Sequence, residues 1–258
     1  MRIVRFRQTR DEPPRWGWVR DDRVGNLEGS PFSLFKRENP TLPLSRLELL
    51  APVEPGKIIC IGRNYVAHAE EHDAEVPELP LMFLKPPSSV IGTRQAILLP
   101  PQSNQVEHEA ELAVVIGRGG RWIPVEDADQ HILGYTAAND VTARDLQRAD
   151  GQWTRAKGFD TFLPLGPWIE TEFAAADALI TCTVNGHMRQ MASTRDMVFP
   201  VRRLVAYISS VMTLSPGDVI LTGTPSGVGV LHDGDEVEIE IEHLGRLVNP
   251  VRTDRRTA

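Results

Sequence analysis

Apolar residues along the chain recur mainly in short runs or at every second position, which is the pattern of β-strands. These strand-like runs lie at residues 57–62, 81–84, 111–116, 132–138, 180–184, 219–222 and 236–241. Helical periodicity is convincing only at residues 65–72, 141–150 and 200–212. Asn185-Gly186 separates two strand-like stretches and predicts a two-residue hairpin turn. We therefore expect an α+β, strand-rich fold with mixed β-sheets.

The first 50 residues have a pattern of their own. Alternating stretches at residues 3–6 and 16–20 are followed by a third strand-like stretch at residues 23–27, in which the chain would run back along the second. This pattern predicts a small β meander. A proline-containing linker then precedes the first apolar strand of the body. We expect a small N-terminal domain at residues 1–50 and a larger domain at residues 51–258.

Composition narrows the classes of function. The chain has 258 residues, enough for one large domain with a small appendage. Its 35 acidic and 28 basic residues give a formal charge of −7, so we expect no nucleic acid and no anionic membrane as partner. No apolar run approaches the roughly 20 residues of a membrane span, and the alternating first residues do not resemble a signal peptide. We expect a cytoplasmic protein.

Only two cysteines are present, Cys60 and Cys182, and they are far apart in the sequence. This spacing provides neither a disulfide framework nor a thiolate zinc site. Both are expected to be buried and reduced.

Three glutamates precede an apolar strand on what should be one of its faces. The two-residue period places Glu107, Glu109 and Glu111 on the face of Ala113 and Val115. A solvated strand end is the simpler interpretation of such a pattern. Here, however, the acids continue directly into core positions, where neighbouring carboxylates cannot all stay ionised without a counter-charge.

A further acid, Asp140, closes the apolar strand at residues 132–139. Carboxylates without nearby thiols are hard oxygen donors, which suit Mg²⁺ or Mn²⁺ better than Zn²⁺. His108 should point to the opposite face of its strand and is interpreted as structural.

His68 and Glu71 lie one turn apart on the short helix expected after Asn64, a possible N-cap. A carboxylate at this spacing can orient an imidazole and make a pair that activates water. The alternative is a solvated helix with incidental charges, because acidic residues crowd this segment.

Basic and amide side chains follow Asp140. Arg144 and Gln147 lie one turn from it if a helix begins near Thr142, so both could face a ligand. Lys157 lies among aromatic neighbours, where a partly desolvated ammonium could stabilise an enolate. An ordinary surface charge is the alternative for Lys157.

The segment from Leu221 to Gly229 contains three glycines after a strand. Their backbone N–H groups can approach an anion closely. The segment lacks the lysine of a phosphate loop and misses the dinucleotide fingerprint, so a carboxylate cradle is favoured over a nucleotide site.

Together these motifs resemble the fumarylacetoacetate hydrolase family, in its single-catalytic-domain branch. The resemblance covers most of residues 57–250, and the first 50 residues match only loosely. It is carried, in order, by GRNYVAHAEEH, FLKPPSS, EAELAVVIG, NDVTARDLQ, GQWTRAKGFDTFLPLGP, VNG and ILTGTPSGVG. Leu163 stands where many relatives have a cysteine, which argues against a required thiol there.

The resemblance implies a β-roll-like catalytic domain, a homodimer and a lid over the substrate, which we place at residues 63–80. Glu107 falls outside the implied metal triad. The implied roles are metal ligands at Glu109, Glu111 and Asp140; water activation by His68 and Glu71; stabilisation of enolate and substrate charge by Lys157 and Arg144; and substrate contacts from Gln147, Gly223 and Thr224.

The resemblance also implies a 2-oxo acid substrate that chelates Mg²⁺ or Mn²⁺ and reacts through a metal-bound enolate. Such an enolate serves C–C hydrolysis of acylpyruvates, oxaloacetate decarboxylation or tautomerisation, and 2-hydroxyhepta-2,4-diene-1,7-dioate isomerisation. Hydrolysis of an acylpyruvate or fumarylacetoacetate-like substrate is our leading hypothesis. A non-catalytic scaffold that binds metal and dicarboxylate, or a purely structural domain with an acidic face, are the alternatives.

Overall fold

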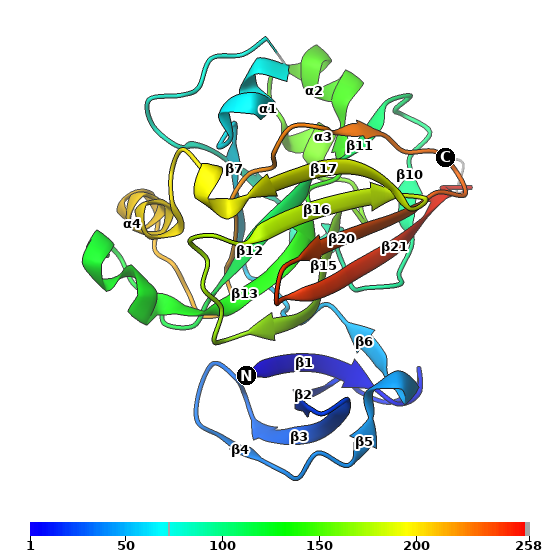
Figure 1. Ribbon diagram of the computed structural model, residues 1–258, viewed down its shortest axis with the longest axis vertical. Coiled ribbons are helices and arrows are strands. Elements are labelled where there is room, and N and C mark those ends of the chain that lie inside the picture. Colours follow the sequence, from blue (N-terminus) through cyan, green and yellow to red (C-terminus); the bar gives the residue numbers. More distant parts are fainter. Residues whose placement is uncertain (72, 256–258) are drawn as a thin grey trace.

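The computed structural model describes residues 1–71 and 73–255, and Figure 1 shows a small lobe of N-terminal strands below a larger body. One mixed sheet runs through both parts. Its main path is β4-β3-β2-β1-β15-β13-β12-β18-β7-β8. The strands of this path are β1 (Arg2–Arg7), β2 (Arg15–Arg20), β3 (Arg23–Gly29), β4 (Phe35–Arg37), β7 (Ile58–Gly62), β8 (Leu81–Lys85), β12 (Ala110–Ile116), β13 (Ile132–Asn139), β15 (Leu163–Glu170) and β18 (Val219–Leu221).

Three short strands join this sheet at its sides. They are β5 (Leu42–Pro43) on β3, β6 (Glu48–Leu50) on β1 and β9 (Val90–Ile91) on β15. The link between lobe and body is the antiparallel pairing of β1 with β15. The amino group of Met1 strengthens it by donating to the Glu170 carboxylate at 2.7 Å.

Two smaller sheets complete the body. The five-stranded sheet is β10 (Ile97–Leu99), β21 (Gly245–Thr253), β20 (Glu236–Ile241), β16 (Leu179–Val184) and β17 (His187–Ser193), in that order. The three-stranded sheet is β14 (Thr142–Ala143), β11 (Val106–His108) and β19 (Gly229–Val230), in that order.

The helices are short and lie at the edges of the body (Figure 1). The α-helices are α1 (Val66–Glu71), α2 (Arg144–Asp150), α3 (Thr154–Lys157) and α4 (Val201–Val211). The 3₁₀ turns are η1 (Leu44–Arg46), η2 (Pro87–Ser89), η3 (Val125–His131) and η4 (Thr194–Asp196).

The core lies on both faces of β12, because alternate residues of a strand point to opposite sides. Leu112 and Val114 pack into the main apolar cluster, with residues of the five-stranded sheet and α4. Ala113 and Val115 pack into a second cluster, with residues of β7 and β15. Glu111 precedes Ala113 by two residues, so it continues the line of this second face.

The predicted fold class is confirmed: the protein is strand-rich, with mixed sheets and few helices. The expected hairpin is present, with positive φ at Asn185 (53°) and Gly186 (74°) between β16 and β17. The domain boundary expected near residue 50 stays a prediction. Of the helix expected at residues 65–72, the last residue lies outside the described residues.

The structure differs from the sequence-based expectation at one helix start, and it contains strands and a helix that were not predicted. The helix expected at residues 141–150 is present but begins later than expected, at Arg144, because Thr142 and Ala143 pair with β11 as β14. Strands β15 and β21 were missed because both contain proline, which usually argues against a strand. The four-residue α3 is too short to show a helical period.

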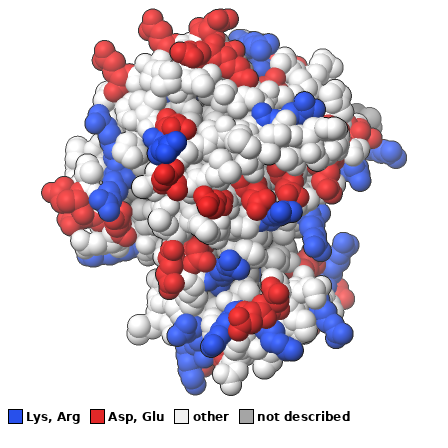
Figure 2. Space-filling model, viewed as in Figure 1, with Lys and Arg blue, Asp and Glu red and all other residues white. Residues whose placement is uncertain are grey.

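Charges of both signs are mixed on the face shown in Figure 2, and acidic side chains gather at the end that carries α1 and α2. Within residues 1–71 and 73–255, no helix is long and apolar enough to cross a membrane.

Candidate active site

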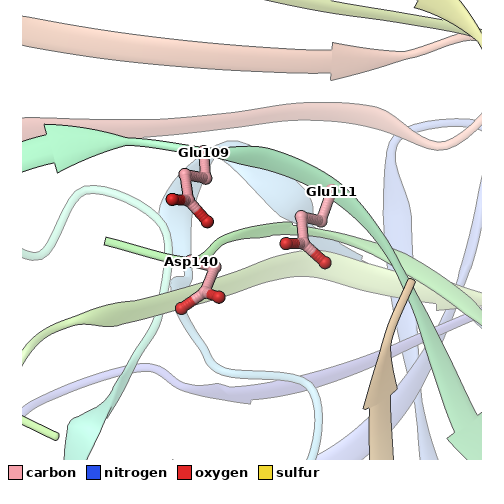
Figure 3. Close-up of side chains that lie close together, drawn as sticks. All are labelled: Glu109, Glu111 and Asp140. Carbon is pink, nitrogen blue, oxygen red and sulfur yellow. The ribbon is translucent and has the colours of Figure 1, made fainter. Parts of the chain in front are cut away.

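Three carboxylates converge inside the body. Glu109 lies between β11 and β12, Glu111 lies on β12, and Asp140 follows β13 (Figure 3). All three are buried, and one carboxylate oxygen from each lies within 4.8 Å of those of the others. The sequence-predicted ligands are therefore brought together in one place.

A break between two strands places Glu109 in this cluster. β11 belongs to the three-stranded sheet and β12 to the large sheet, so the chain changes sheets at Glu109. The Glu109 N–H donates to the Asn139 side chain at 2.9 Å, and the Glu109 carbonyl accepts from the Asp140 N–H at 2.9 Å. These bonds hold two of the carboxylate-bearing residues next to each other across the strand ends.

Buried cations surround the carboxylates. Lys157 Nζ donates to Glu109 at 2.7 Å and to Asp140 at 2.6 Å. Lys85 Nζ donates to the other Asp140 oxygen at 2.6 Å. Arg144 bridges Glu109 and Glu107, and Glu107 is not among the three carboxylates that converge.

The pKa values of Glu109 and Glu111 shift in opposite directions. Burial alone would raise the pKa of Glu109, but the charges of Lys157 and Arg144 hold it below its usual range. Burial, with repulsion from Asp140 and Glu109, raises the pKa of Glu111 well above the ordinary value. Burial would lower the pKa of Lys157, but attraction to Asp140 and Glu109 raises it.

This distribution of charge fits a divalent cation. Four buried carboxylates, Glu107 included, face three buried cations, and no lysine or arginine contact is described for Glu111. Its one described hydrogen bond comes from the Gly223 N–H at 2.6 Å. A hard cation held by carboxylate oxygens would supply the missing positive charge.

The short helix α1 covers the cluster. His68 is 7% exposed and lines the same cavity as the triad. Its Nδ1 lies 3.4 Å from a Glu71 oxygen. The Gly227 N–H donates to the Glu71 carboxylate at 3.0 and 3.2 Å, which fixes the helix to the glycine-containing loop.

The expected capping role of Asn64 was wrong. Its side chain donates to the carbonyls of Phe199 (3.0 Å) and Thr222 (2.7 Å) and accepts from the Phe199 N–H (2.7 Å). Asn64 therefore ties the start of the lid segment to the body and does not cap α1.

The cavity has a volume of about 230 Å³ and receives most of the sequence-predicted residues. Beyond the triad and His68, its walls include Arg144, Gln147, Lys157 and Thr224, with Arg63, Arg148, Phe83 and Trp153. Glu71 and Gly223 are not among the lining residues. Glu71 contacts His68, and Gly223 donates to Glu111, and both of these partners line the cavity. A larger groove of about 1080 Å³ lies between α4 and β13 and touches none of the predicted site residues.

The glycine-containing loop acts differently from the expected ligand cradle. Its Gly223 and Gly227 N–H groups bind carboxylates of the chain itself, Glu111 and Glu71. A substrate contact at Gly223 stays a prediction. His108 is buried beside Gln190 and Cys182, with Nδ1 3.0 Å from Gln190 Oε1.

Three buried polar residues of this region were missed. Lys85 lies within the FLKPPSS motif, which was the one available signal, but the motif alone does not indicate a partner. Asn139 precedes Asp140, and its strand-end position gives no sign that its side chain accepts from the Glu109 N–H. Gln190 lies 80 residues from its partner Ala110, and no local pattern marks it.

A family profile described as "Fumarylacetoacetate (FAA) hydrolase C-terminal" matches residues 57–252. A profile described as "Rv2993c-like, N-terminal" matches residues 1–52. The human protein named oxaloacetate tautomerase FAHD2B, mitochondrial, is 48% identical over 225 residues, covering 82% of this chain and 72% of that protein.

Two solved structures are also similar. The 5-carboxymethyl-2-hydroxymuconate delta-isomerase of Mycobacterium smegmatis has a TM-score of 0.91 and 44% identity, covering 98% of this chain and 100% of that one. The maleylpyruvate hydrolase of Sphingobium sp. SYK-6, in complex with manganese(II) and pyruvate, has a TM-score of 0.80 and 32% identity, covering 99% and 100%.

Proposed function

The chain belongs to the fumarylacetoacetate hydrolase family, as its motifs indicated, and from this premise we propose that it is a divalent-metal-dependent enzyme acting on a 2-oxo acid. The reaction we propose is C–C hydrolysis of an acylpyruvate through an enolate. The observation that carries the proposal is the buried carboxylate triad in a cavity that also holds Lys157 and His68. Mg²⁺ or Mn²⁺ is the proposed ion, held by Glu109, Glu111 and Asp140.

When bound, this cation would supply a Lewis acid that polarises the keto group of the substrate. The chain itself supplies the remaining positive charge. Lys157 Nζ has three N–H donors and uses two for Glu109 and Asp140, so the third would be available to an enolate oxygen of the substrate. Arg144 and Gln147 line the cavity beside it and would orient the substrate carboxylate.

Hydrolysis further requires an activated water. In the proposed step, His68 takes a proton from water, and Glu71 stabilises the imidazolium that forms. The water oxygen adds to the acyl carbonyl, the C–C bond to the pyruvate unit breaks, and its electron pair forms the enolate of pyruvate. The enolate carbon takes up a proton from solvent to give pyruvate, and His68 releases its proton to solvent, which completes the reaction.

Tautomerisation of oxaloacetate is the second candidate. It is favoured by the likeness to the human oxaloacetate tautomerase over most of this chain. This reaction moves a proton between carbon and oxygen through the same enolate and needs no water. The triad and Lys157 would suffice for it.

Variants at His68 and Asp140 test this division of labour. His68→Ala should lower acylpyruvate hydrolysis by about 10²- to 10⁴-fold, the usual effect of losing a positioned general base. Oxaloacetate tautomerisation should survive, because enolate formation does not use the water. Asp140→Ala should remove both activities. The measurement follows enol absorbance and pyruvate release separately, in the presence of Mg²⁺.

His187→Ala is the matched control, because His187 is exposed at the start of β17. Its activities should equal those of the wild type. Parallel loss of hydrolysis and tautomerisation in His68→Ala would mean that His68 also handles the enolate proton. Absence of both activities in the wild type, with a full substrate panel, would instead favour a non-catalytic scaffold.

A further inference from the structure

Gln190 is a fully buried carboxamide on a strand with otherwise exposed neighbours. Arg189 and Met191 on either side of it are exposed. A bulge explains the change of direction: Cys182 pairs with Gln190 and Thr183 with Met188, so Arg189 is an extra residue in β17. The backbone is therefore bent at the point where Gln190 turns inward.

All hydrogen-bonding groups of this side chain are used. Its Oε1 accepts from the Ala110 N–H at 3.0 Å and lies 3.0 Å from His108 Nδ1. Its Nε2 donates to Thr224 Oγ1 at 2.8 Å and to the Pro225 carbonyl at 2.8 Å. The orientation of the amide is unambiguous, because a backbone N–H can only donate and a carbonyl can only accept.

These partners belong to the site. Ala110 separates Glu109 from Glu111, so its N–H fixes the backbone between two candidate metal ligands. Thr224 lines the cavity, and its hydroxyl also donates to the Ala110 carbonyl at 2.9 Å. Gln190, Ala110 and Thr224 therefore form a closed triangle of hydrogen bonds.

The same triangle connects the ligand strand to the loop that holds Glu111 and Glu71. Gly223 precedes Thr224 and donates to Glu111, and Gly227 follows shortly after and donates to Glu71. The loop also packs closely on β17, because a Cβ at Gly227 would clash with the Arg189 carbonyl oxygen. The Gln190 side chain, which lies on β17, is thus hydrogen-bonded both to the start of β12 and to the glycine-containing loop.

We propose that Gln190 is a positioning residue that sets the spacing of Glu109 and Glu111 and places Thr224 in the cavity wall. It does not line the cavity itself, so it acts through these residues. The inference rests on the metal site of the proposed function. Its physical basis is that groups behind metal ligands fix ligand geometry and thereby affinity.

The experiment measures Mn²⁺ binding to the full chain by calorimetry, together with the electron paramagnetic resonance spectrum of the bound ion. Gln190→Met keeps the length of the side chain but removes every hydrogen bond. We expect it to weaken Mn²⁺ binding by about 10- to 100-fold and to change the spectrum.

Asn249→Leu is the matched control. Asn249 is also buried, and its amide donates to two backbone carbonyls, those of Gly92 (2.9 Å) and Gln95 (2.8 Å). It contacts none of the cavity residues in these hydrogen bonds. Both variants should lower Tm, whereas only Gln190→Met should change the Kd for Mn²⁺ and the spectrum.

A wild-type Kd in Gln190→Met, or equal weakening in Asn249→Leu, would overturn the inference. A wild-type protein that binds no Mn²⁺ would refute the proposed metal function itself, which distinguishes the two failures, and the inference would fall with it. If Gln190→Met does not fold, Gln190→Glu replaces it. Its carboxylate can accept from Ala110 but cannot donate to Thr224 and Pro225, so unchanged Mn²⁺ binding there would again contradict the proposal.

Discussion

At the scale of single residues, Lys85 shows how the charge of the site is balanced. Its ammonium is fully buried and donates to Asp140 and to the Val141 carbonyl. Burial and repulsion from Lys157 lower the pKa of Lys85, while Asp140 opposes this shift. The ion pair with Asp140 therefore keeps the buried Lys85 ammonium charged despite its loss of hydration. This positive charge neutralises part of the negative charge of the carboxylate cluster.

Lys85→Met should make the metal-free protein less stable and more responsive to metal. Losing a buried ion-pair partner is destabilising, by about 3–5 kcal/mol where the remaining charge has no other partner. Asp140 keeps its ion pair with Lys157, so we expect a smaller loss here. Added Mg²⁺ would bring positive charge back to the cluster. Thermal unfolding with and without Mg²⁺ should show a lower metal-free Tm and a larger Mg²⁺-induced rise than in the wild type.

Lys57→Met provides the comparison, because Lys57 pairs with buried Asp218 at 2.6 Å without contact to the triad. Mg²⁺ should not restore the Tm lost in this variant beyond the wild-type effect. An equal Mg²⁺ response in all three proteins would show that Lys85 does not balance the metal site.

At the scale of elements, the described residues of the lid segment at 70–79 are exposed or half-buried. In α1, only His68 and Ala69 are buried, whereas every residue of β12 is buried. Further along the segment, Leu79 is 57% exposed. Regions with little burial open locally at low free-energy cost. The mobility expected for residues 63–80 stays a prediction.

Hydrogen exchange tests the lid. Without ligand, amides of residues 63–80 should exchange much faster than those of β12. Gly227→Ala should increase opening further, because Gly227 has φ +97° and no room for a Cβ, so the contact with Glu71 would be lost. Gly234→Ala is the control, since its φ is +94° but its surroundings are open. Protection of residues 63–80 equal to that of β12 would contradict a lid.

At the scale of the whole molecule, the N-terminal lobe is part of the same sheet as the body. The pairing of β1 with β15 continues the hydrogen-bonded ladder from the lobe to the strands beside the site. The edge strand β4 is exposed along its length, and Leu34 before it is 95% exposed. The lobe therefore buries part of its surface against the body through β1, whereas its opposite edge, β4, is exposed to solvent.

We expect a homodimer, from the family resemblance and from the small meander that cannot bury both of its faces alone. Sedimentation equilibrium at micromolar concentration should give the mass of two chains. The mass should not change when Mg²⁺ is added, because the triad lies within one chain. A mass of one chain across the micromolar range would rule out this assembly.

The sequence by itself determined about half of the strands, the hairpin at Asn185-Gly186 and the candidate acids Glu107, Glu109, Glu111 and Asp140. The family resemblance, and not the pattern, selected Glu109, Glu111 and Asp140 among them. These features depend on local rules: a two-residue period defines a strand face, and turn residues permit positive φ. The placement of Glu111 on the face of Ala113 follows from this period alone. The family motifs added the roles expected for the remaining site residues.

Only the tertiary structure decided which polar partners meet. Lys85 and Asp140 are 55 residues apart, and Gln190 and Ala110 are 80 residues apart. Local periodicity does not encode such pairs, because burial leaves each polar group to bond whatever the packed sheets bring within reach. For the same reason β15, with its prolines, was recognisable as a strand only once its neighbours β1 and β13 were in place.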